Sequence, residues 1–230
     1  MRKKIQFVNK LTIGLAILVA STAFQVSAME RFTEAEIKAS PYLQSVLKRK
    51  GETYDTSEFR KDGPYRIALA AQGTSNSWSA LFDEHANWYA EQLGSGVIEE
   101  LLYADAQASA DKQVPQVEDL LAQEPDALIL VPMGAAALAA PVERAMAQGV
   151  PVILCASAVE TDNFVTEVGT NLYASGAGLA EYLAKRLNGK GKVLMMTGIP
   201  GVSTSDIMEA GGKATFKKYQ GIELIGVQPG

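Results

Sequence analysis

Apolar runs of strand length recur along the chain and alternate with helix-length segments, and this alternation constrains the fold more than any other feature. The runs are Tyr65–Ala71, Val97–Tyr103, Ala127–Val131, Pro151–Cys155 and Phe164–Val168. Nearly continuous apolar strands are typical of a parallel sheet that is covered on both faces. The segments between the first four runs carry apolar residues at helical spacing. The pattern predicts a doubly wound α/β fold with right-handed crossovers.

A second unit of the same kind begins after Val168. Leu179, Leu183 and Leu187 mark a helix, and a strand is expected at Lys192–Thr197. A loop, a helix over Asp206–Tyr219 and a strand over Ile222–Val227 follow. Two strands cannot close a core of their own. We therefore expect the sequence to be a fragment or to be incomplete at its C-terminus, with the second lobe truncated.

The N-terminus has the layout of a secretory signal peptide. A basic start, "MRKK", precedes the apolar stretch Leu11–Phe24, and small residues at Val26–Ala28 suit a cleavage site. The alternative is a retained membrane anchor, but the apolar stretch is short for that role. The sequence predicts export to the periplasm. Cys155 is the only cysteine, so neither a lipid-anchoring cysteine nor an internal disulfide is expected.

The predicted organisation has four parts. Residues 1–28 are the signal peptide, 29–63 a charged extension or linker, 64–168 the first α/β lobe and 169–230 the start of the second. The linker holds a possible helical piece over Tyr42–Lys50. Without the four basic residues of the signal, 17 basic residues face 26 acidic ones, a net charge of −9. That balance disfavours binding to nucleic acid or to anionic lipid, and a soluble mature protein is expected.

The sequence offers little for metal binding or catalysis. His85 is the only histidine, and zinc sites need three or four ligands. A nucleophile would have to recruit His85 from a helix, away from the strand ends. "GKGK" follows a helix, and "GIPG" lacks the third glycine and the acidic residue of a dinucleotide fingerprint. We expect no metal, no cofactor and no enzyme activity.

Polar segments follow the predicted strands, where ligands bind in open α/β sheets. The first is "AAQGTSNSW", in which small polar residues lead to Trp78 at the start of a helix. Helix capping alone explains several of the polar residues. An indole beside amide and hydroxyl groups suits the flat apolar face of a small polar molecule. The alternative is that Trp78 packs under its own helix.

These stretches resemble the periplasmic ligand-binding proteins of ABC importers, in particular the ribose-binding-like sugar binders. "IALAAQGTSNSW" resembles the first strand and its binding loop. "DKQVPQVEDLLAQEPDALILVPMGAAALAAPVERAMAQGVPVI" is similar to the family's stretch in which a helix with Gln-Asp-Leu precedes Asp-Ala-Ile-Ile, an apolar residue and Pro. "VGTNLYASGAGLAEYLAKRL" resembles the crossing into the second lobe. "GKVLMMTGIPGVSTSDIMEAGGKATFKKYQGIEL" resembles the strand, loop and helix that face the ligand from that lobe. The resemblance runs from Pro64 to the last residue.

The resemblance implies two lobes joined by three crossing segments that close over a ligand by a hinge motion. The first crossing would be Val168–Tyr173. The sequence departs from the sugar binders at three places: Ala156 and Ser157 replace an Asp-Arg pair, Asp206 replaces an Arg, and Val131 replaces an Asn. Arginine grips hydroxyl pairs through a fixed fork of donors, so a ribose-like ligand is in doubt. An acidic cleft would favour a neutral polyol, a nucleoside-like ring or a cation.

The sequence therefore predicts an exported solute-binding protein of an ABC transporter, with a permease and its ATPase as partners. Its ligand is a small polar, sugar-like molecule. The alternative is a periplasmic sensor that presents the ligand to a membrane receptor or a sensor kinase. A sugar-responsive DNA-binding regulator and an enzyme are less favoured. The predicted ligand-binding residues are Gln72, Ser75, Asn76, Trp78, Asp105, Ser157, Thr170, Asn171, Ser203 and Asp206.

Overall fold

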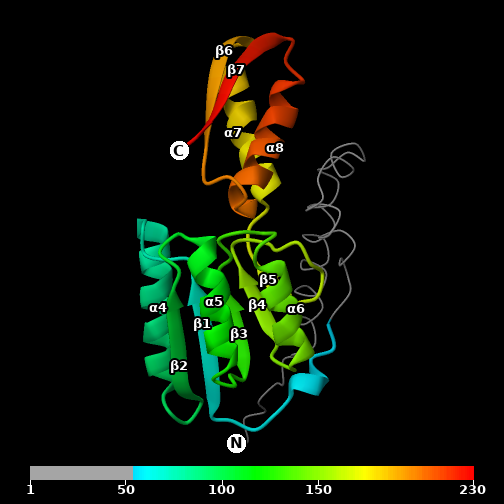
Figure 1. Ribbon diagram of the computed structural model, residues 1–230. Helices are drawn as coiled ribbons and strands as arrows, with labels where there is room; N and C mark the ends of the chain where they lie inside the picture. Colours follow the sequence, from blue (N-terminus) through cyan, green and yellow to red (C-terminus); the bar gives the residue numbers. More distant parts are fainter. Residues whose placement is uncertain (1–53) are drawn as a thin grey trace, which may run out of the picture. The chain divides into compact units, whose positions relative to one another are not determined.

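The computed structural model describes residues 54–230, and the predicted signal peptide and the helical piece at 42–50 lie outside the described residues. A five-stranded parallel sheet, here called the large sheet, has the order β2-β1-β3-β4-β5. Its strands are β1 (Tyr65–Ala71), β2 (Ile98–Asp105), β3 (Ala127–Leu130), β4 (Val152–Cys155) and β5 (Thr166–Val168). Figure 1 shows these strands with their arrows pointing the same way. The predicted α/β fold is confirmed.

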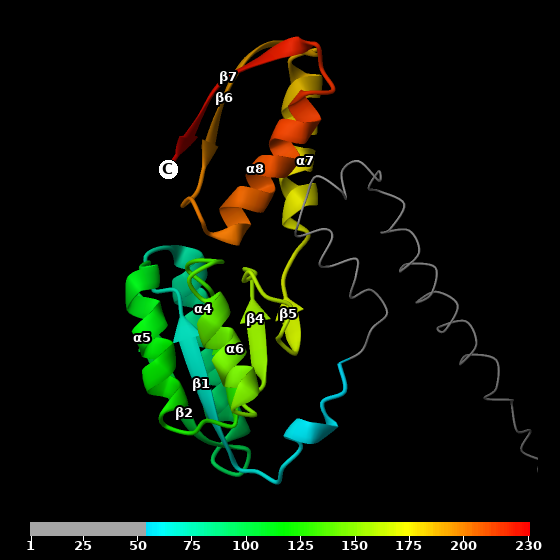
Figure 2. The same ribbon diagram turned by 45° about the vertical axis from the view of Figure 1, so that its right-hand side comes forward.

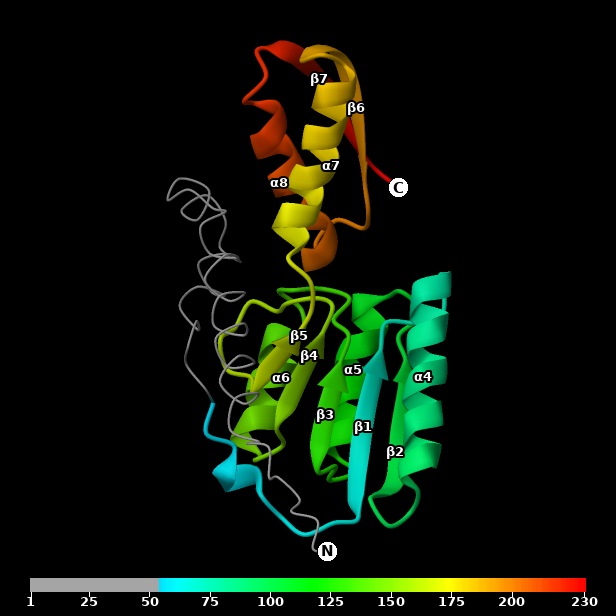
Figure 3. The same cartoon turned by 180° about the vertical axis from the view of Figure 1, so that it is seen from behind.

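Three helices connect the strands of the large sheet. They are α4 (Ser77–Leu93), α5 (Ala110–Leu121) and α6 (Ala139–Ala147). The chain moves one way along the sheet from β1 to β2 and the opposite way from β2 to β3 to β4. Because such crossovers are right-handed, α4 lies on the face opposite α5 and α6. Figure 3 shows α4 beside the edge strand β2.

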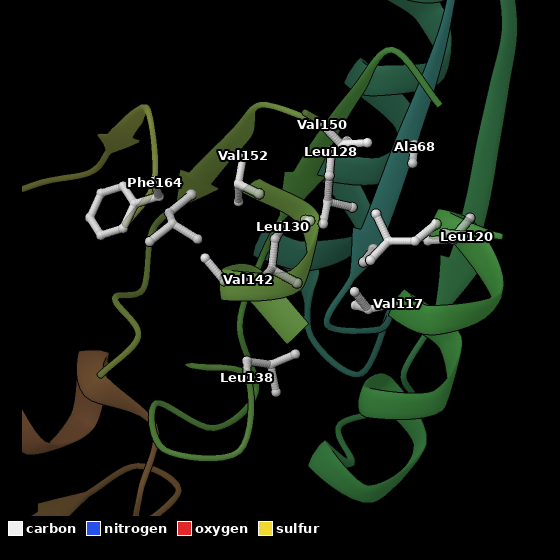
Figure 4. Close-up of a cluster of buried hydrophobic side chains, with 14 of the residues drawn as sticks. Ala68, Val117, Leu120, Leu128, Leu130, Leu138, Val142, Val150, Val152 and Phe164 are labelled. Carbon is white, nitrogen blue, oxygen red and sulfur yellow. The ribbon is translucent and has the colours of Figure 1, made fainter. Parts of the chain in front are cut away.

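The core of the large sheet lies between its central strands and the helices α5 and α6 (Figure 4). Leu128, Leu130 and Leu154 are fully buried and belong to the same cluster as Val117 and Val142 of the helices. Alternate residues along β3 and β4 are buried, so the buried residues share one face of the sheet. By packing the central strands against the helices, this core holds the carboxyl ends of the strands in place.

A second, smaller unit is built from the strands β6 (Lys190–Thr197) and β7 (Gly221–Pro229) and the helices α7 (Leu172–Arg186) and α8 (Ser203–Phe216). The two strands pair in parallel and form the small sheet. The helices lie side by side (Figure 2). The large sheet and the small sheet, each with its helices, together belong to a single compact part of the chain.

Glycines set the contact between α7 and α8. A Cβ atom at Gly176 would come within 2.7 Å of the carbonyl carbon of Met208, and closer still to its oxygen. Gly211 stands equally close to the backbone of Tyr173. The buried face of α7 therefore carries small residues, Gly176, Ala180 and Ala184 among them. The absence of a side chain at these positions lets the two helix backbones approach each other.

The leucines that mark α7 in the sequence are not its buried face. Leu179 is 65% exposed and Leu183 is 38% exposed. Leu187 packs against the core of the small sheet from the end of the helix. The predicted helix is confirmed, and its buried residues include Gly176, Ala180 and Ala184 rather than Leu179 and Leu183.

Candidate functional site

The loop after β1 is shaped by glycine and ends in a helix cap. Gly73 has a φ of 113°, and a Cβ there would meet Asp105 Oδ1 at 2.8 Å. Asn76 caps α4: its Oδ1 accepts a hydrogen bond from the backbone N–H of Ser79 at 3.0 Å. Capping thus explains Asn76 in part, as expected for an Asn at this position.

Trp78 lies in the first turn of α4, and its side chain is 49% exposed. Its ring stacks on that of Phe82, with centroids 5.6 Å apart and planes 21° from parallel. Phe82 follows Trp78 by four residues, so the two side chains share one face of the helix. The alternative that Trp78 packs under its own helix does not hold, because half of its side chain is exposed. The pair forms an aromatic platform.

A cavity of about 680 Å³ lies beside this platform. Its walls come from the loops after β1, β3, β4 and β5, and from the segment between β6 and the first turn of α8. Large-sheet loops therefore meet α8 at one place. β1 and β3 are neighbours in the sheet, and the chain leaves them in opposite directions, which is where open α/β sheets form a ligand crevice.

Six of the ten predicted ligand-binding residues line this cavity. They are Gln72, Ser75, Asn76, Trp78, Ser157 and Thr170. The structure therefore brings together residues from three separate loops of the large sheet and from α4. Their role in binding a ligand stays a prediction, because their position establishes proximity only.

The other four predicted residues do not line the cavity. Asp105 Oδ1 accepts a hydrogen bond from the backbone N–H of Gln107 at 2.6 Å, within its own loop. Asn171 caps α7 by accepting from the N–H of Ala174 at 2.9 Å. The Ser203 hydroxyl accepts from the N–H of Ala158 at 2.7 Å.

Asp206, the fourth of these residues, is exposed, and its Oδ1 faces the N–H of Gly201 at 3.4 Å. This contact places the carboxylate near the loop that precedes α8. The hydrogen bond is weak at this length.

Hydroxyl groups join the loop after β4 to the start of α8. Thr204 Oγ1 donates to the carbonyl oxygen of Ala156 at 3.1 Å, and the Ser157 and Thr204 hydroxyl oxygens are 2.6 Å apart. A small apolar cluster of Ala106, Met133 and Val202 lies nearby. These contacts hold one wall of the cavity against the other.

The cavity is electrically neutral at its surface. Among the described residues that line it, none carries a charged side chain. Asp105 and Asp206 are not among the lining residues, and each carboxylate accepts a hydrogen bond from a backbone N–H group, so the acidic cleft stays a prediction. A neutral wall gives no electrostatic attraction for a cationic ligand.

Cys155 also lines the cavity and is only partly buried. Burial, followed by the charge of Glu167, raises the pKa of its thiol. The thiolate form is therefore scarce at neutral pH, and this cysteine is a poor nucleophile there.

Sequence reasoning missed several lining residues. Phe82 could have been found, because it stands one helical turn after Trp78. Thr204 and Ser205 adjoin the predicted Ser203, but nothing in the sequence shows which hydroxyl of "STS" faces inward. Met133 and Ile199 carry apolar side chains in strand-end loops and gave no signal of their own.

A smaller cavity, about 470 Å³, lies in the small-sheet unit against α7 and α8. Its wall is mostly apolar and includes the exposed Leu179, Leu183 and Met196. It lacks the strand-end loops of the large sheet, so the larger cavity is the better candidate site.

No metal site is apparent in the part of the chain that the structure describes. Within residues 54–230, no three His, Cys, Asp or Glu side chains gather as metal ligands would. His85 is exposed on α4. The predicted absence of a metal, a cofactor and catalysis stays a prediction. Over the same residues, no helix has both the length and the apolar character needed to cross a membrane.

Comparison with known proteins identifies one family. Residues 67–230 match the periplasmic binding protein domain family. The ribose import binding protein of Bacillus subtilis is 34% identical over 141 residues, which cover 61% of this chain and 45% of that protein. The xylitol-binding protein of Mycolicibacterium smegmatis is 31% identical over 126 residues, 55% of this chain and 36% of that protein.

Solved structures share the fold. The fructose-binding periplasmic domain of a hybrid two-component system has a TM-score of 0.66 and 26% identity, over 72% of this chain and 54% of that chain. A galactofuranose-binding protein has a TM-score of 0.67 and 25% identity, over 73% of this chain and 56% of that chain. The chain spans about half the length of the relatives that it matches.

Proposed function

This chain belongs to the periplasmic binding protein domain family, and on that premise we propose that it captures a small neutral sugar or polyol without transforming it. The observation that carries the proposal is the uncharged cavity with an aromatic platform at the carboxyl ends of the parallel strands. The names of its relatives support the ligand class, since they bind ribose, xylitol, fructose and galactofuranose.

Each group in the cavity has a role in this proposal. The Trp78 ring stacks on the C–H face of the sugar, with Phe82 behind it. Gln72, Ser75 and Thr170 offer neutral hydrogen-bond partners to hydroxyl groups. Because none of the described residues that line the cavity has a charged side chain, recognition would depend on shape, stacking and neutral hydrogen bonds.

The cavity has two sides that could move toward each other over a ligand. The large-sheet loops form one side, and the start of α8 forms the other. The chain passes between them at Gly169–Asn171, between β5 and α7. We propose that this segment bends as the two sides close over the ligand and exclude water from it.

The proposed setting is the periplasm, where the protein would deliver its ligand to an ABC permease with its ATPase. Two observations support this setting: the signal-like residues 1–28 and the name of the ribose import relative. A sensor that presents the ligand to a membrane receptor or sensor kinase is the second candidate. One observation favours it, since a matched structure is the periplasmic domain of a hybrid two-component system.

A thermal-shift screen of the full chain tests the proposal. Neutral monosaccharides and polyols are expected to raise the melting temperature in a concentration-dependent way, because they bind the folded form only. Sugar acids and amines should have no effect. The matched variants are Trp78→Ala, which removes the platform, and Trp88→Ala, which removes an equally exposed tryptophan on the same helix outside the cavity.

The Trp78→Ala variant should lose most of the shift, and the Trp88→Ala variant should keep it. Equal shifts in the two variants, or no response to any neutral sugar or polyol, would overturn the proposal. Co-purification with a permease separates import from sensing, since a sensor would associate with a receptor or a kinase instead.

A further inference from the structure

Two hydroxyl groups that line the cavity already donate hydrogen bonds within the protein. Thr204 donates its only hydroxyl proton to the carbonyl oxygen of Ala156. In the 2.6 Å contact between Ser157 and Thr204, Ser157 must therefore be the donor, because a hydroxyl carries one proton. Both groups can still accept hydrogen bonds from a ligand. Neither can donate one without breaking a bond that joins the two walls.

The remaining polar side chains are few. The Asn76 side-chain oxygen accepts from the N–H of Ser79, so the side-chain amide nitrogen is the group of this residue that remains to donate to a ligand. The side chains of Gln72, Ser75, Thr170 and Ser205 also line the cavity, and they make no hydrogen bond to another described residue. All of these groups are neutral, and neutral hydrogen bonds are weaker than those of an arginine or a carboxylate.

Apolar side chains make up much of the wall, and they come from both sides. Trp78 and Phe82 form the platform, and Met133 and Cys155 lie in the loops and strand ends of the large sheet. Ile199 faces them from the loop between β6 and α8. A hydroxyl group pressed against these side chains would lose its water and gain no partner.

We infer that the preferred ligand is a neutral monosaccharide from which at least one hydroxyl group is missing or alkylated, such as a 6-deoxyhexose. This inference rests on the proposed function and names the ligand class of the same site. A methyl group on the sugar packs against the apolar wall, whereas a hydroxyl at that place stays unpaired. An unpaired buried polar group costs enough to change affinity by about tenfold or more.

Isothermal titration of the full chain with matched sugar pairs tests the inference. L-Fucose and L-galactose differ only in the hydroxyl group at carbon 6, and so do L-rhamnose and L-mannose. The deoxy sugar of at least one pair is expected to bind about tenfold or more tightly than its partner. D-Ribose serves as a fully hydroxylated reference of pentose size.

The outcomes separate this inference from the proposed function. If some neutral sugar or polyol binds, but neither deoxy sugar binds about tenfold or more tightly than its own partner, the inference is wrong and the proposed function stands. The same holds if D-ribose binds as tightly as the tighter deoxy sugar. If no sugar of the set, and no other neutral sugar or polyol, binds, the proposed function is wrong and the inference falls with it.

A pair of variants tests the apolar wall directly. Ile199→Asn places an amide on the wall, and Ile225→Asn makes the same change at an exposed position on β7 outside the cavity. Both isoleucines are about half exposed, so neither change should prevent folding. The deoxy preference should fall at least threefold in the Ile199 variant and stay unchanged in the Ile225 variant. An unchanged preference in both would overturn the role of this wall.

Discussion

Replacing Gly176 with alanine is expected to loosen the contact between α7 and α8. The new Cβ would lie 2.7 Å from the Met208 carbonyl carbon, at least 0.7 Å short of the 3.4 Å at which ordinary contact begins. The obstructing atoms are backbone, which cannot rotate away. Overpacking of this kind costs about 1–3 kcal/mol, and the better helix propensity of alanine returns about 1 kcal/mol. We expect the upper part of that range, a net loss of about 1–2 kcal/mol.

Gly178 provides the matched control, because a Cβ there would meet nothing within 4 Å. It lies two residues further along α7 and is exposed, so Gly178→Ala should stabilise the helix by up to about 1 kcal/mol. The two variants should thus differ by about 2–3 kcal/mol, with opposite signs relative to the parent.

Hydrogen exchange of peptides from α7 and α8 is the suitable assay, since it reports local opening. Tryptophan fluorescence would not serve, because both tryptophans lie on α4. Exchange should be about tenfold faster in Gly176→Ala and slower in Gly178→Ala than in the parent. Exchange in Gly176→Ala that is as slow as in the parent would refute the close backbone contact.

Three further predictions concern the support and the wall of the cavity. Gln113 is fully buried, and its side-chain oxygen accepts a hydrogen bond from the N–H of Met133 at 2.8 Å. In urea denaturation, Gln113→Ala should therefore lower the free energy of unfolding by about 2–3 kcal/mol, whereas Gln123→Ala, at an exposed position, should change it little. Burial, followed by the charge of Asp105, raises the pKa of the Asp83 carboxyl. Its contribution to stability is therefore complete below the unfolded pKa of about 3.9 and is lost as the pH rises through the folded pKa. In thermal melts, Asp83→Asn should gain stability relative to the parent as the pH rises above about 3.9, and a difference that stays constant with pH would contradict this. The rate at which N-ethylmaleimide labels Cys155, measured by mass spectrometry, should be slow at neutral pH and slower still with a bound sugar. A labelling rate that a saturating sugar leaves unchanged would place the ligand elsewhere.

The strands of the large sheet were predictable because each is an apolar run of strand length. The predicted Tyr65–Ala71 is β1 itself, and the runs at 127–131 and 151–155 each differ from β3 and β4 by one residue. The buried face of α7 was not predictable from its leucines. Its partner helix approaches so closely that only glycine and alanine fit between them, and a hydrophobic periodicity does not register that contact.

The position of the cavity was predictable from the sequence, and its lining residues were predictable only in part. The rule that parallel sheets bind ligands at their carboxyl ends located the loops that meet at the cavity. It did not settle which polar side chains face the cavity. Asp105 hydrogen bonds to a backbone N–H two residues ahead, and such an Asx turn competes locally with any role toward a ligand. The hydroxyls of Ser157 and Thr204 meet only because the fold brings together residues 47 positions apart in the chain.

A titration of two single-tryptophan variants tests the central claim most directly. Trp88→Phe leaves Trp78 as the only tryptophan, and Trp78→Phe leaves Trp88. Addition of a sugar that stabilises the protein should change the fluorescence of the Trp88→Phe variant with a saturating dose dependence and leave that of the Trp78→Phe variant unchanged. A response from Trp88 alone would contradict the account, because the sugar would then bind away from the cavity that Trp78 lines.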